Sequence, residues 1–111
     1  MTIGYDDFDK VDIRIGTVVS ARPNDAARKP AYVLEVDFGP EIGVKKSSAQ
    51  LTEIYPVAEL IGRQVAAVVN FPPKQIAKIV SDILVLGFPD EQGRVVLIGV
   101  DRPVPDGGRL F

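Results

Sequence analysis

The sequence predicts an all-β fold in the form of a small barrel. Along several short segments apolar residues alternate with polar ones, which is the period of a strand with one buried face. Proline and glycine residues interrupt the chain at fairly regular distances, as in barrels and sandwiches made of short strands. The chain has 111 residues, 46% of them hydrophobic and 25% charged, so we expect residues 1–111 to form a single domain with an ordinary hydrophobic core.

The first two strands follow from alternation alone. The first is expected to start at Val11 and to continue through Val19, because apolar and polar residues alternate from its start. A polar loop with several basic residues is expected over residues 22–30. The clearest alternation in the chain lies in residues 32–38, which we interpret as the second strand. Two glycines and a proline in residues 39–43 then predict a turn.

The next elements are a third strand and a short helix. The third strand is expected over residues 44–51, and within it Lys45 and Lys46 must point to opposite faces. One of these two lysines therefore faces inward or lies at an edge. Thr52 can act as the N-cap of a short helix that runs to Ile61.

The remaining strands complete the order of a known barrel. A fourth strand is expected in residues 63–71 and is stopped by the two prolines at 72–73, which cannot donate to a sheet ladder. Residues 83–88 and 95–100 flank a turn-rich loop at 89–93, which is the layout of a hairpin. Three strands, a short helix and further strands predict an OB-fold, a five-stranded Greek-key barrel with its short helix between strands 3 and 4.

Missing residue types exclude several kinds of chemistry. The chain has no cysteine and no histidine, so disulfides, thiolate metal sites, cysteine nucleophiles and Ser/His hydrolase sites are excluded. No carboxylate near a strand lies in a motif that pairs it with a base or a metal, and the glycines form neither a GxGxxG motif nor a P-loop. We therefore expect no enzymatic activity, no metal and no cofactor.

Hydropathy bears on where the protein works. The longest apolar runs are far shorter than the roughly 20 residues that span a bilayer. The first ten residues, MTIGYDDFDK, lack the basic and apolar segments of a secretory signal. We therefore expect a cytoplasmic protein without membrane insertion.

The distribution of charge is uneven. The net charge is −2, which at first opposes a polyanionic partner. Residues 14–78, however, carry nine basic and six acidic side chains, whereas both flanking segments are acidic. This pattern fits an ordinary mixed surface or a local basic site, and charge alone leaves both interpretations open.

Three short segments combine basic and hydrogen-bonding side chains. Residues 42–50 (IGVKKSSAQ) suit contacts to phosphates and sugars, or else form a solvated edge strand protected by its lysines. Residues 70–76 add a lysine and an asparagine next to Phe71, which either stacks on a base or belongs to the core. Residues 25–29 put two basic side chains in the loop that commonly frames an OB-fold binding face, with a solvated charge pair as the alternative.

Taken together, several motifs resemble the CsaA family. They are Phe8 to Arg14 (FDKVDIR), Arg28 to Tyr32 (RKPAY), Asp37 and Phe38, Ser47 to Gln50 (SSAQ), Val69 to Gln75 (VNFPPKQ) and Ser81 to Gly87. The resemblance covers nearly the whole chain. CsaA proteins are similar to the tRNA-binding domain at the C-terminus of some methionyl-tRNA synthetases and at the N-terminus of bacterial phenylalanyl-tRNA synthetase β-subunits.

The resemblance implies a non-catalytic OB-fold homodimer that binds tRNA, with extra terminal segments that help to join the subunits. It also implies an export-related chaperone activity that binds unfolded or preprotein segments. Carried across by motif, RNA contact is expected at Arg28, Lys29, Lys45, Lys46, Ser47, Ser48, Gln50, Asn70 and Lys74. The alternative is a peptide-binding chaperone with little or no physiological RNA binding, whose apolar surface includes Ile76, Ile79 and Phe88.

Overall fold

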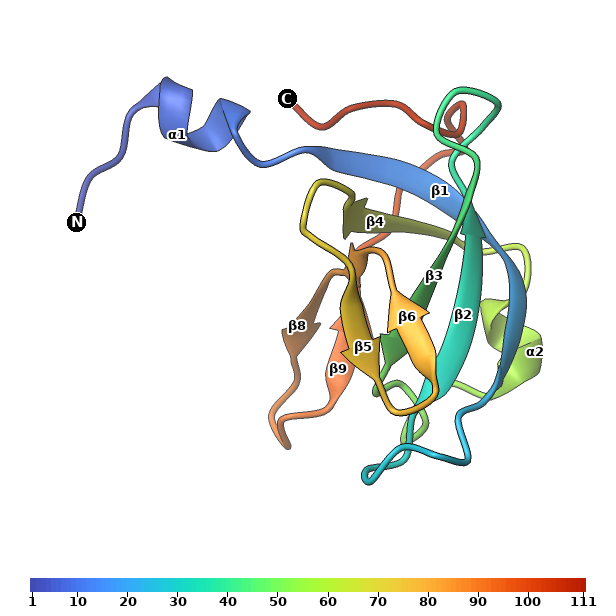
Figure 1. The fold of residues 1–111 in the computed structure, drawn as a ribbon. Coiled ribbons are helices and arrows are strands. Elements are labelled where there is room, and N and C mark those ends of the chain that lie inside the picture. The colour runs from blue at the N-terminus through green and yellow to red at the C-terminus, as the bar shows by residue number, and fades with distance from the viewer.

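The computed structural model describes residues 1–111 as a nearly closed β-barrel with little helix (Figure 1). Its elements are α1 Tyr5–Asp9, β1 Ile13–Pro23, β2 Tyr32–Asp37, β3 Val44–Ala49, α2 Val57–Leu60, β4 Gln64–Val68, β5 Lys74–Ile76, β6 Ile79–Ser81, β7 Leu84–Val85, β8 Gly87–Pro89 and β9 Val95–Leu97. A five-stranded antiparallel sheet has the order β3-β2-β1-β4-β7, and two hairpins pair β5 with β6 and β8 with β9. With α2 between β3 and β4, this is the predicted OB-fold.

Strand β1 organises the barrel because it pairs with β2 along one part of its length and with β4 along the other. A β-bulge between Val18 and Ser20, just after the residues that pair with β4, bends the strand within its pairing with β2. Gly16 lies on its concave side, where a Cβ atom would approach Val36 Cγ1 to 2.7 Å and Phe38 Cδ1 to 2.8 Å. The absence of a side chain at Gly16 therefore allows the curved strand to pack against β2.

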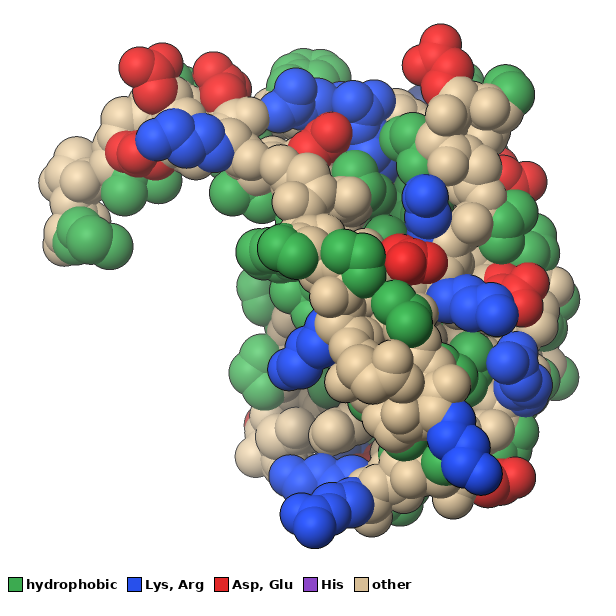
Figure 2. Space-filling view, viewed as in Figure 1, with side chains coloured by type: hydrophobic (Ala, Val, Ile, Leu, Met, Phe, Trp, Pro, Cys, Tyr) green, Lys and Arg blue, Asp and Glu red, His purple; other side chains and the backbone are tan.

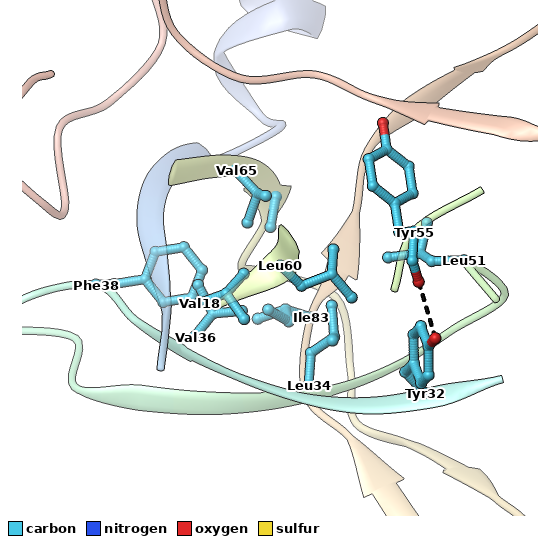
Figure 3. Close-up of a cluster of buried hydrophobic side chains, with 11 residues drawn as sticks. Val18, Tyr32, Leu34, Val36, Phe38, Leu51, Tyr55, Leu60, Val65 and Ile83 are labelled. Atoms are coloured by element: carbon cyan, nitrogen blue, oxygen red, sulfur yellow. Dashed lines mark hydrogen bonds between the residues drawn. The ribbon is translucent and has the colours of Figure 1, made fainter. Parts of the chain in front are cut away.

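The core fills the inside of this barrel (Figure 3). Its eleven buried residues are Val18, Tyr32, Leu34, Val36, Phe38, Leu51, Tyr55, Leu60, Val65, Ala67 and Ile83. Alternate residues of β2 supply one wall, in the period predicted from the sequence. The Tyr32 hydroxyl donates a hydrogen bond of 2.8 Å to the backbone carbonyl of Tyr55 inside this cluster. The polar end of a buried tyrosine is thus satisfied within the core.

The barrel is closed by contacts between β3 and the segment that precedes β7. The backbone N–H of Asp82 donates to the Lys46 carbonyl at 2.8 Å, and the Ser48 N–H donates to the Ser81 hydroxyl at 3.3 Å. These bonds satisfy backbone groups on the outer edge of β3 that the main sheet leaves unpaired. They also bring residues 81–82 against the strand with the KKSS sequence.

The two terminal segments lie side by side next to β1. The Arg14 guanidinium forms an ion pair with Asp12 at 2.7 Å and donates to the Gly107 carbonyl at 2.9 Å. Arg109 reaches the same carboxylate at 3.6 Å and donates to the Asp9 carbonyl. Helix α1 itself stands away from the barrel, as Figure 1 shows, and all of its residues are exposed.

Several expected boundaries were wrong. The first strand begins at Ile13 rather than Val11 and extends to Pro23, into the segment expected to be a loop, while β3 ends at Ala49 and β4 at Val68. The helix expected from Thr52 to Ile61 is only Val57–Leu60. Proline disfavours a helical conformation in the residue before it, and Pro56 itself has an extended ψ of 150° as the N-cap. Helix α1 and the β5–β6 hairpin were not expected.

The structure contains no helix with the length and apolar character needed to cross a membrane.

Candidate nucleic-acid interface

Three adjoining hollows form a continuous concave surface at one end of the barrel, which we call the basic groove. The first hollow lies between residues 29–30, 50–54 and 93–95, and the second between residues 26–31 and the tip of the β5–β6 hairpin. Lys29 and Gln50 line both. The third hollow lies between β5 and residues 81–84 and shares Ser48 and Ile76 with the second. The loops that frame the groove meet at the lower end of the barrel in Figure 1.

The groove brings together the three segments that the sequence singled out. Arg28 and Lys29 come from the β1–β2 loop, Ser48 and Gln50 come from β3 and the residue after its end, and Lys74 comes from β5. In the sequence these segments are separated by long stretches of chain. The pairing of β2 with β3 and the contact of β3 with β6 place them next to one another.

The pleat of β3 separates the residues that it contributes. Lys46 and Ser48 face outward, and Lys46 is exposed. Ser47 is only 1% exposed, and its hydroxyl donates to the Ser48 carbonyl at 3.4 Å. We therefore remove Ser47 from the expected contacts, because its side chain does not reach the surface. Lys45 lies on the same inward face as Ser47 and is half-buried, so the expectation of one inward lysine is met by Lys45.

Asn70 has a role within the chain. Its side-chain nitrogen donates to the Lys10 carbonyl at 2.7 Å, and its side-chain oxygen accepts from the Asp12 N–H at 3.0 Å. Asn70 is absent from all three hollows of the groove. Its amide anchors the segment that leads into β1, so the structure gives Asn70 a role in the fold, away from the groove.

Apart from Arg94, which pairs with Asp90, the cations that line the groove form no ion pair with a carboxylate. The ion pairs of the chain are Lys10–Asp7, Arg14–Asp12, Arg22–Glu35, Arg94–Asp90 and Arg109–Asp12. Arg28, Lys29 and Lys74 of the groove take part in none of them, and neither does Lys46, which is exposed on β3 outside the three hollows. Figure 2 shows Lys and Arg side chains at the lower end of the barrel and a cluster of acidic side chains on the projecting N-terminal arm. The local charge is therefore available to a polyanion although the net charge is −2.

Several residues that line the groove were not expected to contact RNA, among them Arg94, Asp82 and Ile76, the last of which was expected only on a peptide-binding surface. Arg94 lies in the first hollow, where Asp90 holds its guanidinium at 2.8 Å. Asp82 and Ile76 lie in the third. Ile76 and Asp82 lie in segments that the sequence singled out, but only the closure of the barrel by residues 81–82 places them beside the groove cations. Phe71, for which stacking and core packing were both open, is 53% exposed and lines the third hollow.

Comparison with known proteins places this geometry in a family. Residues 13–109 match the family model described as a putative tRNA binding domain. The methionine–tRNA ligase of Flavobacterium johnsoniae is 32% identical over 108 residues, which are 97% of this chain and 15% of that enzyme. The chain thus spans about 15% of the length of this curated relative.

Two solved structures match along the whole chain. The chaperone CsaA from Bacillus anthracis is 47% identical, with a TM-score of 0.93 and coverage of 100% of both chains. The CsaA chaperone protein from Picrophilus torridus is 46% identical, with a TM-score of 0.92 and coverage of 99% of this chain and 100% of the other. Both the barrel and its terminal segments are therefore shared with these structures.

Proposed function

Because the chain belongs to the family of putative tRNA-binding domains and, within it, to the CsaA proteins, we propose that it is a non-catalytic tRNA-binding protein that uses the basic groove. One observation carries the proposal. Cations from the β1–β2 loop and β5 converge with the Ser48 hydroxyl of β3 on one concave surface, and Arg28, Lys29 and Lys74 pair with no carboxylate. Such a surface attracts a phosphate backbone.

The proposed contacts divide by chemistry. Arg28, Lys29, Lys46 and Lys74 supply positive charge for phosphates. Ser48 and Gln50 supply neutral hydrogen-bonding groups for phosphates or riboses. Most of these contacts carry no base sequence, so binding selects the shape of a folded tRNA through the spacing of its phosphates.

We further propose that residues 1–111 act as one domain in the cytoplasm and that the protein works as a homodimer. The support is an apolar hollow beside the terminal segments, lined by residues that include Ile13, Val100, Val104, Leu110 and Phe111. Phe111 is fully exposed in the single chain, and Leu110 is 49% exposed. A second copy would cover this surface and would offer the same RNA two basic grooves, which raises affinity without new contacts.

The test is a fluorescence anisotropy titration of mixed tRNA across a salt series. The variant Lys29→Ala/Lys74→Ala removes two groove cations. The control Lys10→Ala/Arg102→Ala removes two exposed cations outside the groove, so both variants carry the same net charge. We expect wild-type affinity to fall steeply with salt and the groove variant alone to bind weakly. Equal binding by the two variants would reject the groove, and no binding at low salt would reject the function.

A second candidate function is an export-related chaperone that binds unfolded or preprotein segments. The supporting observation is the exposed apolar surface of the hairpins, where Phe88 is 67% and Val96 40% exposed. Ile76 and Ile79, also expected to contribute, are partly buried. This function predicts binding of apolar peptides that changes little with salt. Displacement of labelled tRNA by such a peptide would show whether the two surfaces overlap.

A further inference from the structure

The third hollow of the basic groove, which we call the Phe71 pocket, differs from the rest of the groove. Its volume is about 360 Å³, within the range of small-molecule sites. Phe71, Pro72 and Leu84 give it apolar walls, and Lys74 lies at the same site. An exposed aromatic ring beside a cation is the combination with which proteins hold the base and the phosphate of a single-stranded nucleotide.

Asp82 puts a carboxylate into this pocket and is held in place by β3. Its backbone N–H donates to the Lys46 carbonyl at 2.8 Å, and its Oδ2 accepts from the Lys46 N–H at 3.4 Å. Its Oδ1 accepts no hydrogen bond from the protein, and the carboxylate takes part in no ion pair. The contact between β3 and residues 81–82 therefore positions the Asp82 carboxylate, which is available to accept hydrogen bonds from a ligand.

The two serines of the pocket differ in availability. The Ser81 hydroxyl accepts from the Ser48 N–H at 3.3 Å and donates to the Ile83 carbonyl at 3.2 Å, so it is committed to the fold. The Ser48 hydroxyl makes no hydrogen bond within the chain. The free polar groups of the pocket are thus the Asp82 carboxylate, the Ser48 hydroxyl and the Lys74 ammonium.

From these contacts we propose that the Phe71 pocket binds an unpaired guanine base of the RNA, an inference that rests on the proposed tRNA-binding function. Guanine presents two adjacent N–H donors, on N1 and on the exocyclic N2, and the Asp82 carboxylate accepts both. Adenine, cytosine and uracil each present an acceptor at this edge, which a carboxylate repels. Phe71 stacks on the base, and Lys74 contacts a neighbouring phosphate.

The same polar groups disfavour an apolar peptide side chain as the occupant. Such a side chain would displace water from the Asp82 carboxylate and the Ser48 hydroxyl without supplying a hydrogen bond to either. The pocket also opens onto the cations of the groove through Ser48 and Ile76, which line the second hollow as well. An RNA backbone bound along the groove therefore lies next to the opening of the Phe71 pocket.

The test uses labelled RNA heptamers of sequence UUUXUUU, where X is guanine, inosine, adenine or uracil, with mixed tRNA titrated in parallel. We expect the guanine heptamer to bind about tenfold more tightly than the adenine and uracil heptamers, as for a bidentate contact to a base. Inosine, which lacks the N2 amine, should lie between them. Phe71→Ala should weaken binding of all heptamers.

Asp82→Asn tests the carboxylate, since asparagine keeps an acceptor for the Lys46 N–H but replaces one carboxylate oxygen with a donor. We expect this variant to lose the guanine preference and to keep binding tRNA. Asp101→Asn, which removes a negative charge outside the pocket, should keep the preference.

The tRNA titration separates the two proposals. Tight tRNA binding with equal affinity for all heptamers, or with no heptamer binding, overturns the guanine pocket and leaves the proposed function standing. An equal increase in the affinity of Asp82→Asn for every heptamer also overturns the guanine pocket. Asp82 would then act only by repelling the phosphates of the RNA. Absence of binding to both tRNA and heptamers overturns both proposals.

Discussion

The hydroxyl of Tyr32 in β2 donates a hydrogen bond of 2.8 Å to the backbone carbonyl of Tyr55, the residue before Pro56, which is the N-cap of α2. Both tyrosines are at least nine-tenths buried. The Tyr55 hydroxyl in turn accepts from the Leu97 N–H of β9 at 3.0 Å. The two side chains thus connect the main sheet, the segment before α2 and the β8–β9 hairpin through one buried and one partly buried hydrogen bond.

Tyr32→Phe is expected to lower the free energy of unfolding by about 1–3 kcal/mol, because the buried Tyr55 carbonyl loses its partner while the aromatic packing is kept. Urea unfolding followed by circular dichroism measures the change. Tyr5→Phe, at a position 88% exposed, is the matched control and should leave the midpoint unchanged. Equal stability of the two variants would mean that the Tyr55 carbonyl finds another donor.

Gly16→Ala is expected to destabilise the barrel by about 1–3 kcal/mol through overpacking. The new Cβ would lie 2.7 Å from Val36 Cγ1 and 2.9 Å from Phe38 Cε1, so the wall of the core must shift. Thermal unfolding measures the loss. Gly4→Ala has open space around its Cβ and an ordinary φ of −95°, and should unfold like the wild type. A stable Gly16→Ala variant would contradict the tight contact between β1 and β2.

Lys46→Ala should weaken tRNA binding more than Lys45→Ala, because the pleat of β3 points Lys46 outward and Lys45 inward. If Lys46 contacts one phosphate, the slope of log affinity against log salt should become less steep by about 0.7–0.9. Fluorescence anisotropy at several salt concentrations measures the slope for each variant. The opposite ranking would show that RNA approaches another face of β3.

Acid should weaken the β8–β9 hairpin through Asp90. The backbone N–H of Arg94 donates to its carboxylate, and this bond, with others from the Gln92 backbone and the Arg94 side chain, lowers the pKa of Asp90. A carboxyl whose pKa is lower in the folded state stabilises the fold above its unfolded pKa, and this contribution is lost as the pH falls through the folded pKa.

The stability difference between wild type and Asp90→Asn should therefore be largest near pH 7 and should shrink below about pH 4. Urea midpoints at pH 7 and pH 3 measure it, with Asp101→Asn as the control for removing one carboxylate elsewhere on the surface. A difference that is constant with pH would mean that the Asp90 charge contributes nothing to the hairpin.

Alternation predicted the strands whose faces differ most in burial. In residues 32–38 the inward positions are all apolar and buried, and the strand predicted from their alternation is present as β2. The short elements carry no such pattern. The hairpin strands β5 and β6 have three residues each, and α1 has five exposed residues, too few for a period to be read. These elements depend on tertiary contacts that local sequence does not express.

The candidate site was predictable in its parts and not in its assembly. The three segments with basic and hydrogen-bonding residues were recognised from composition, but their meeting depends on β3 lying between β2 and residues 81–82. The same pairing decides that Ser47 turns inward and Ser48 outward, which the sequence SSAQ cannot tell. Asn70 looked like a contact residue because its partners, Lys10 and Asp12, lie some sixty positions away in the chain.

The pairing of β1 with residues near the other end of the chain has a consequence for synthesis. Ile15 exchanges backbone hydrogen bonds with Gly107 and Gly108, and Leu110 donates to the Ile13 carbonyl. The edge of β1 at Ile13 and Ile15 therefore stays unpaired until residues 107–110 have been translated. Closure between such distant segments is slow relative to local pairing, so a nascent chain that stalls before these residues presents an open strand edge to its surroundings.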